Sequence, residues 1–201
     1  KYVARDVLNE IIKNPDKVAL GGEEKEITVL FSDIRGFTAI AEKKSPKEVV
    51  GILNRYFEIM SREILKHKGV IDKYIGDAVM AYWGAPIEDP DQADRALSAS
   101  ISMLGELKKL NDELRQSGAD EINIGIGLYT GKAIVGNIGA ENRFDYTAIG
   151  DTVNVAARLN GLSKEYKSML IIGESTKNKL NKTFSLIELG STKLRGRDEA
   201  I

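Results

Sequence analysis

The hydrophobic pattern of the chain begins with an alternating run. Ile27, Val29 and Phe31 occupy every second position of the stretch ITVLFSDIRGFT (27–38). This period of two predicts a half-buried strand. Asp33 then falls at the tip of the strand, where the chain turns.

Two long segments space their apolar residues three or four apart, as amphipathic helices do. The first has Ser45 as N-cap, Pro46 at the first helical position and Glu48 to complete a capping box, and it ends near Gly69. The second follows APIEDPDQ (85–92) and ends near Gly118. The apolar stripes, expected in the core, are Val49, Leu53, Tyr56, Met60 and Ile64, then Leu97, Ile101, Leu104, Leu107, Leu110 and Leu114.

The remaining apolar runs are short and strand-like. Residues 69–84 read as a β-hairpin with its turn at Gly76 and Asp77. Residues 122–139 read as two strands, with glycines where the backbone turns or is approached closely. Residues 144–162 read as a strand, a turn and a helix, 169–176 as a strand and a short helix, and 184–189 as a last strand. This order predicts an α+β fold with a ferredoxin-like βααβαβ core.

Composition narrows the possible functions. The 201 residues are 42% hydrophobic and 29% charged, which suits one main globular domain, and no apolar run is long enough to cross a bilayer. The net charge of -1 gives no sign of a nucleic-acid partner. The absence of cysteine excludes disulfides and thiolate sites, and a single histidine, His67, excludes histidine-rich metal sites.

The first residues are expected to form a separate lead-in. The stretch NPDKVALGGEEKE (14–26) contains a proline and paired glycines that are typical of a linker. We therefore expect residues 1–25 to connect an upstream module, sensory or membrane-linked, to a main domain over 26–201.

Two aspartates are the first candidates for chemistry. Asp33 and Asp77 are both expected at strand tips, and adjacent strands would bring them side by side. Two close carboxylates repel unless a cation lies between them, and oxygen ligands select Mg²⁺ or Mn²⁺. The amides of Gly36, Phe37 and Thr38, at the start of the next helical segment, could bind phosphate oxygens. Either aspartate alone would be read as an ordinary turn residue.

A second candidate group surrounds the helix after AIGD (148–151). Asn154 and Arg158 are four residues apart and leave the same helix face, where an amide could fix a ribose and a guanidinium could meet phosphoryl charge. Lys73 and Thr147 lie in predicted strands, where each has an ordinary structural reading.

Three motifs together resemble a known family. LFSDIRGFT (30–38), IDKYIGDAVMAYWG (71–84) and YTAIGDTVNVAARL (146–159) are similar, in order and spacing, to the signatures of the class III adenylyl and guanylyl cyclase catalytic domain. The resemblance implies a head-to-tail homodimer with active sites built from both chains. In one chain Asp33, Asp77 and the Ile34 carbonyl would hold two Mg²⁺ or Mn²⁺ ions.

The resemblance assigns the remaining roles to the second chain. Lys73 and Thr147 would contact the base, Asn154 the ribose and Arg158 the α-phosphate. The 3′-hydroxyl would attack the α-phosphorus and release pyrophosphate. A basic residue near the C-terminus contacts the outer phosphates in many relatives. The candidates for this contact are Lys193, Arg195 and Arg197, and we prefer Arg197.

The two residues expected to contact the base, Lys73 and Thr147, favour ATP over GTP. Adenine offers an N1 acceptor and an N6 donor, which a lysine and a hydroxyl satisfy, whereas guanine presents N1–H toward the lysine. Guanylyl cyclases of this family typically carry Glu at the position of Lys73. The Thr147 hydroxyl can also donate, and threonine here is similar to a bacterial and cyanobacterial subgroup that is often bicarbonate-responsive.

The sequence therefore predicts a cytoplasmic adenylyl cyclase that makes cyclic AMP for signal transduction. A guanylyl cyclase is the first alternative, and a catalytically silent dimerisation module is the second. A diguanylate cyclase would need a Gly-Gly-Asp-Glu-Phe hairpin, which YIGDAV (74–79) is not. The regulatory signal is not indicated by the residues.

Overall fold

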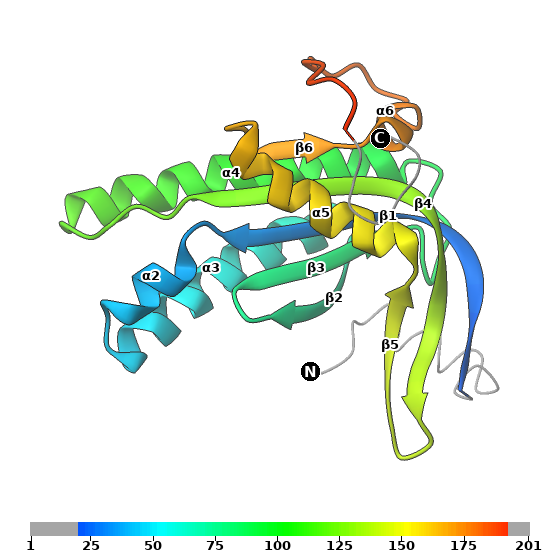
Figure 1. The fold of residues 1–201 in the computed structure, drawn as a ribbon, viewed down its shortest axis with the longest axis horizontal. Helices are drawn as coiled ribbons and strands as arrows, with labels where there is room; N and C mark the ends of the chain where they lie inside the picture. Colours follow the sequence, from blue (N-terminus) through cyan, green and yellow to red (C-terminus); the bar gives the residue numbers. More distant parts are fainter. Residues whose placement is uncertain (1–19, 193–201) are drawn as a thin grey trace.

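The computed structural model describes residues 20–192 (Figure 1). The strands are β1 (Gly21–Ile34), β2 (Val70–Ile75), β3 (Ala78–Trp83), β4 (Ile124–Ala140), β5 (Arg143–Ile149) and β6 (Leu170–Ile172). The helices are α2 (Phe37–Glu42), α3 (Pro46–Lys66), α4 (Gln92–Gln116), α5 (Asp151–Glu165) and α6 (Glu174–Lys177). The predicted lead-in, apart from its last few residues, lies outside this range.

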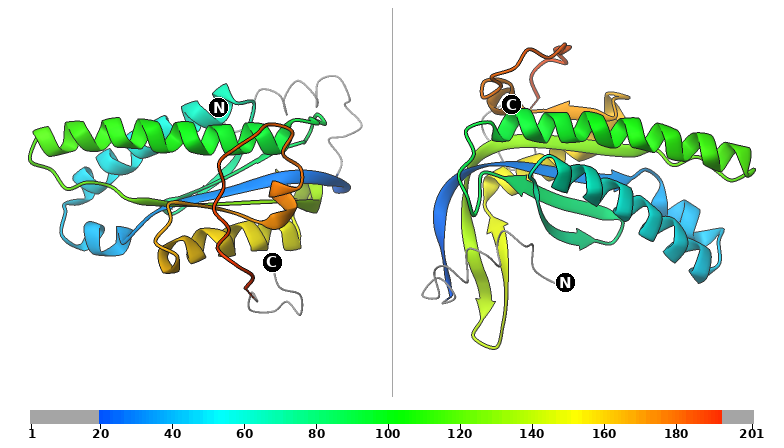
Figure 2. Two further views of the ribbon diagram at one scale, coloured as in Figure 1. Left: turned by 90° about the horizontal axis from the view of Figure 1, so that it is seen from above. Right: turned by 180° about the vertical axis from the view of Figure 1, so that it is seen from behind.

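The six strands form one sheet in the order β2-β3-β1-β4-β5, and β6 pairs in parallel with β4. All other pairings are antiparallel. Helices α3 and α4 cover one face and α5 covers the other, so the sheet is seen edge-on between α4 and α5 (Figure 2). The predicted α+β fold with a ferredoxin-like core is confirmed.

The predicted helix and hairpin signals are confirmed. The Ser45 side chain accepts from the Glu48 N–H while the Glu48 carboxylate accepts from the Ser45 N–H, which is the expected capping box. Helix α4 follows the second apolar stripe to Gln116, but the expectation that the whole stripe lies in the core is wrong for Ile101, which is half exposed. Strands β2 and β3 meet at Gly76, whose φ of 62° permits the tight turn.

Strand β1 is buried more completely than its alternation predicts. Leu30 and Ile34 pack under α3 and α4, while Ile27 and Val29 pack in the core on the face that α5 covers. The expectation of a half-buried strand is wrong because helices cover both faces of this central strand.

Two strand predictions are also wrong. Residues 122–139 contain one continuous strand, β4, because β1 pairs with it all the way from Gly21 to Ile34 and holds it extended across its glycines. Residues 184–189 form no strand. The edge of β4 that faces away from β1 pairs with β5 and β6. Phe184 packs on the core from a segment without regular secondary structure, while Ile187 is exposed.

None of the helices within residues 20–192 combines the length and apolar composition needed to cross a membrane.

Candidate active site

The two candidate metal ligands lie together. Asp33 is the next-to-last residue of β1, and Asp77 lies in the turn between β2 and β3. Because Ser32 pairs with Val79, the turn folds over the end of β1. The Ile34 N–H donates to Oδ2 of Asp77 at 3.0 Å. The predicted meeting of two carboxylates at neighbouring strand ends is confirmed as geometry.

The local electrostatics suit a cation. The pKa of Asp33 is raised, mainly by burial and also by the negative charge of Asp77, although a hydrogen bond from Asn160 and the charge of Arg35 oppose the shift. The raised pKa means that the ionised form of Asp33 is energetically unfavourable in this position. A bound cation would offset that cost. No three His, Asp or Glu side chains of the described residues cluster around a metal-sized space. Two carboxylates and a carbonyl nevertheless fit Mg²⁺, which keeps its other positions for water and phosphate.

Arg35 and Tyr56 hold the end of β1 in place. The Arg35 side chain donates to the Ile124 carbonyl at 3.1 Å, the Ser163 hydroxyl at 2.9 Å and the Ser168 carbonyl at 2.6 Å. The buried Tyr56 hydroxyl from α3 lies 2.9 Å from the Ser32 hydroxyl, next to Asp33 in sequence. These contacts tie the carboxylate to α3, α5 and β4, so its position does not depend on the turn alone.

The turn after Asp33 also forms as expected. Gly36 adopts a left-handed conformation with φ of 68° and acts as N-cap of α2, which begins at Phe37 and includes Thr38. The three amides therefore lie at a helix start beside the carboxylate pair.

Lys73 and Thr147 are brought to one carboxylate, that of Asp72. The Asp72 side chain is completely buried, and Lys73 Nζ lies 3.2 Å from its Oδ1. The Thr147 hydroxyl donates to both Asp72 oxygens, at 2.7 Å and 2.9 Å, and the Ala148 N–H donates at 3.1 Å. Strands β2 and β5 are the two edges of the main sheet, so this carboxylate connects two edges that have three strands between them.

Asn154 and Arg158 lie on α5, as predicted, but face away from Asp33 of the same chain. Asn160 is the α5 residue that lies beside Asp33 and lowers the pKa of its carboxyl. At about 100° per residue, Arg158 points roughly 160° and Asn154 roughly 120° away from Asn160 around the helix. Neither side chain has a polar partner among the described residues. They are available to a ligand or to another chain.

Sequence reasoning missed three residues of this region. Asp72 lies within the IDKYIGD motif but was overlooked, because Lys73 and Asp77 of the same motif already had assigned roles. Asn160 and Arg35 act through contacts distant in sequence, which no local pattern reveals. Lys193, Arg195 and Arg197 lie outside the described residues.

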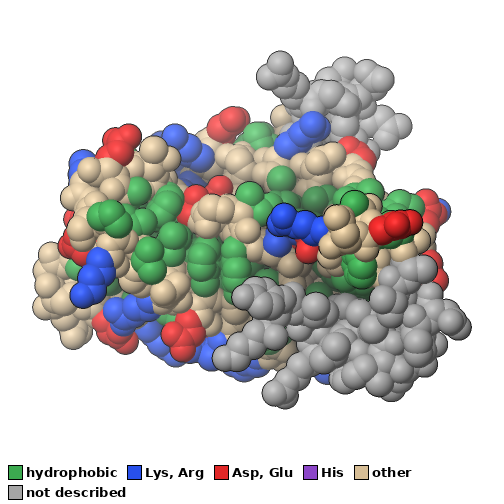
Figure 3. Space-filling view, turned by 90° about the horizontal axis from the view of Figure 1, so that it is seen from below, with side chains coloured by type: hydrophobic (Ala, Val, Ile, Leu, Met, Phe, Trp, Pro, Cys, Tyr) green, Lys and Arg blue, Asp and Glu red, His purple; other side chains and the backbone are tan. Residues whose placement is uncertain are grey.

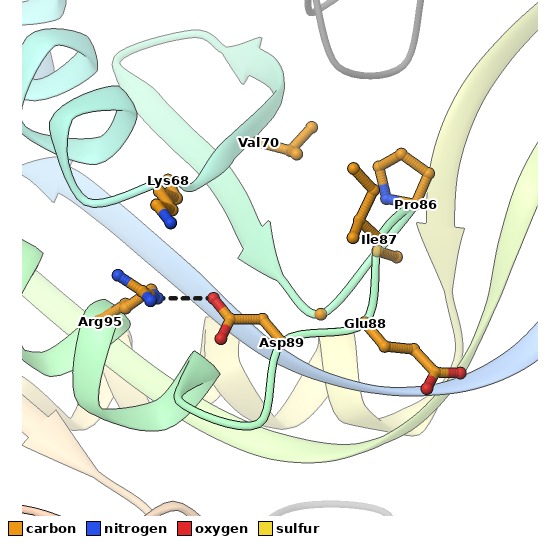
Figure 4. A pocket seen from close by; sticks show the side chains of 9 residues that line it. Lys68, Val70, Pro86, Ile87, Glu88, Asp89 and Arg95 are labelled. Carbon is orange, nitrogen blue, oxygen red and sulfur yellow. Dashed lines mark ion pairs between the residues drawn. The ribbon is translucent and has the colours of Figure 1, made fainter. Parts of the chain in front are cut away.

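A separate cavity of about 460 Å³ opens at the other end of the β2–β3 hairpin (Figure 4). Its lining includes Lys68, Val70, Ile87 and Arg95, and Arg95 is paired with Asp89 at 2.6 Å. The cavity contains none of the predicted site residues. We assign it no role in the chemistry.

The ferredoxin-like sheet and its carboxylate pair are the arrangement expected of a nucleotidyl cyclase catalytic domain. A family model described as "Adenylate and Guanylate cyclase catalytic domain" matches residues 22–201, and the chain belongs to that family.

Three similar proteins illustrate the match. "Adenylate cyclase 1" of Rhizobium meliloti (strain 1021) is 35% identical over 200 residues, covering 100% of this chain and 30% of that protein. "Adenylate cyclase" of Anabaena cylindrica is 41% identical over 184 residues, covering 88% of this chain and 36% of that protein. The crystal structure of the guanylyl cyclase Cya2 superposes with a TM-score of 0.83 at 33% identity, covering 90% of this chain and 91% of that one.

These similar proteins differ in the nucleotide base that their names imply. The two curated relatives are named as adenylate cyclases, whereas the solved structure is that of a guanylyl cyclase. Overall similarity therefore does not choose between ATP and GTP. The chain spans about a third of the length of the curated relatives it matches.

Proposed function

We propose that this domain converts ATP to 3′,5′-cyclic AMP and pyrophosphate. The observation that carries the proposal is the meeting of Asp33 and Asp77 at neighbouring strand ends, in a chain of the cyclase family. Lys73 supports ATP as the substrate, because its ammonium matches the N1 acceptor of adenine and meets the N1–H of guanine donor to donor.

The carboxylate half of the site would hold the metal. Two Mg²⁺ or Mn²⁺ ions on Asp33, Asp77 and the Ile34 carbonyl would supply Lewis-acid activation of the 3′-hydroxyl and neutralise phosphate charge. The amides of Gly36, Phe37 and Thr38 would bind phosphate oxygens at the start of α2.

The other half of the site would hold the base and the ribose. Asn154 would orient the ribose, and the Arg158 guanidinium would stabilise charge that develops on the α-phosphate. Arg197 is the first candidate for the outer phosphates, with Lys193 and Arg195 as alternatives.

The two halves are proposed to come from different chains of a head-to-tail homodimer. Asn154 and Arg158 turn away from Asp33 of their own chain, so a substrate that meets all three needs a second copy. Figure 3 shows hydrophobic side chains gathered on one face of the molecule. Among the exposed large apolar side chains are Tyr74 and Ile75 of β2 and Ile149 of β5. Such a surface suits an interface.

The cellular setting follows from the substrate. We propose that the domain works in the cytoplasm, where ATP is available, downstream of a sensory or membrane-linked module in a longer chain. Cyclic AMP would then carry the signal of that module.

The test is cyclic nucleotide production from ATP and from GTP, with Mg²⁺ and with Mn²⁺. Cyclic AMP as the main product supports the proposal. Cyclic GMP as the main product would favour the guanylyl cyclase alternative. No product from folded, dimeric protein would favour a silent regulatory module.

A further inference from the structure

Asp72 is a buried charge that the proposed mechanism does not use. It lies at an irregularity of the β2–β3 pairing, between Ile71 and Lys73, where the strand register shifts. The side chain is completely buried. An ionised side chain is costly to bury unless polar partners surround it, so its partners indicate what the position achieves.

Within residues 20–192, every polar contact of Asp72 comes from a donor. Lys73 Nζ lies 3.2 Å from Oδ1, the Ala148 N–H donates to Oδ2 at 3.1 Å, and the Thr147 hydroxyl reaches both oxygens. An ionised carboxylate only accepts hydrogen bonds. The Thr147 hydroxyl must therefore be the donor in this pair.

This arrangement fixes a proton that would otherwise rotate. A threonine hydroxyl has one proton and two acceptor lone pairs. Because the proton of Thr147 points to Asp72, only lone pairs remain for another partner. Lys73, beside the same carboxylate, is a donor only. The pair then presents one acceptor and one donor.

We propose that Asp72 determines the base preference by making Thr147 an obligatory acceptor and by orienting Lys73. This inference rests on the proposed contact of Lys73 and Thr147 with the base. Adenine matches both groups through its N6 amino group and N1. Guanine mismatches both, because its O6 acceptor would face the Thr147 oxygen and its N1–H would face the lysine. Asp72 is a positioning residue, since it acts through Thr147 and Lys73.

The discriminating variant is Asp72→Asn. Its Oδ1 still accepts from the Ala148 N–H, whereas its amide NH₂ faces Thr147 and donates to the hydroxyl oxygen. The Thr147 proton is then released toward the base, where it matches guanine O6. We expect the ratio of kcat/KM for ATP to that for GTP to fall at least about tenfold, the value of one hydrogen bond.

Thr147→Val supplies the matched background, because valine has the shape of threonine without the hydroxyl. In Thr147→Val protein, Asp72→Asn should change the ratio only through Lys73, and therefore by much less than in the wild type. An unchanged ratio in Asp72→Asn alone, or an equal fall in both backgrounds, would overturn the inference.

Binding measurements separate this inference from the proposed function. Wild-type protein that cyclises neither nucleotide contradicts the proposed function. The affinities of 3′-deoxy-ATP and 3′-deoxy-GTP, which lack the attacking hydroxyl, then report the base preference without chemistry. A binding ratio that shifts toward GTP in Asp72→Asn supports the inference, and a ratio that stays constant contradicts it.

A measurement on the wild type covers the case in which Asp72→Asn does not fold. The hydroxyl proton of Thr147 should exchange slowly with water and show a nuclear Overhauser contact to the Ala148 amide. The exposed Thr183 hydroxyl is the internal control. Exchange of Thr147 as fast as that of Thr183 would show that the proton is not held, and would overturn the inference.

Discussion

Asn160 and Arg158 lie two residues apart on α5 and point to nearly opposite sides of the helix. Asn160 is buried and lies close enough to Asp33 to lower the pKa of its carboxyl, whereas Arg158 is half-buried and turned away. One helix therefore supports the carboxylate pair of its own chain and presents a guanidinium elsewhere. This division is the arrangement expected if the proposed site is shared between two chains.

Replacement of Asp33 by Asn should abolish the stabilisation that Mn²⁺ gives. The wild type should gain about 2.7 kcal/mol at a Mn²⁺ concentration 100-fold above Kd. The pKa of Asp33 is raised, chiefly by burial, so protons should displace the metal at a higher pH than from an ordinary aspartate. Thermal unfolding at several pH values, with and without Mn²⁺, measures both effects.

The stability of Asp33→Asn relative to the wild type in the absence of metal is a separate test. With a raised folded-state pKa, ionised Asp33 destabilises the folded protein, and this cost grows as pH rises from the unfolded pKa through the folded one. Without metal at neutral pH, Asp33→Asn should be at least as stable as the wild type. A variant that is clearly less stable would contradict this reading of the site.

Lys73→Glu should erode the preference for ATP. The substitution removes a charged donor from the proposed N1 contact, and such hydrogen bonds contribute enough to lower kcat/KM for ATP about 10- to 100-fold. The ratio to GTP should fall accordingly. Lys108→Glu on the exposed side of α4 makes the same charge change and should leave the ratio unchanged. Equal ratios in both variants would remove Lys73 from base recognition.

Gly127→Ala should destabilise the domain by about 3 kcal/mol. A Cβ at Gly127 would collide with the backbone of α5 at Ala156 and Asn160, so the helix would have to move off β4. Gly51→Ala in α3 is the control, since a Cβ there meets nothing and alanine favours the helix by about 1 kcal/mol. Chemical denaturation of both variants measures the difference, and similar stabilities would contradict the close packing of α5.

Specific activity should rise with protein concentration. If each site needs two chains, dilution below the dimer dissociation constant removes activity by mass action. Cyclase assays over a wide concentration range, compared with sedimentation of the same samples, measure the relation. Constant specific activity of a sample that sediments as a monomer would exclude a shared site.

The sequence predicted what depends on local chemistry. The capping box of α3, the Gly76 turn and the Gly150–Asp151 start of α5 all follow from residue types at fixed spacing. The meeting of Asp33 and Asp77 followed from placing both at strand tips, once their strands were taken as neighbours.

The missed features depend on contacts between distant segments. The glycines of β4 look like turn signals, yet Gly127 is there because α5 packs against it, and β1 keeps the strand extended. Asp72 gains its significance only when β5 returns to the far edge of the sheet. Neither relation has a local signature in the sequence.

The most direct test of a shared site is to mix two inactive variants. Asp33→Ala lacks a proposed metal ligand, and Arg158→Ala lacks the proposed phosphate contact. In a mixed dimer one site carries both lesions and the other carries neither. Equimolar mixing should therefore restore about a quarter of wild-type activity if dimers form at random, with half of the dimers mixed and one of their two sites intact. A mixture that stays inactive, although both variants are folded and form mixed dimers, would contradict the account.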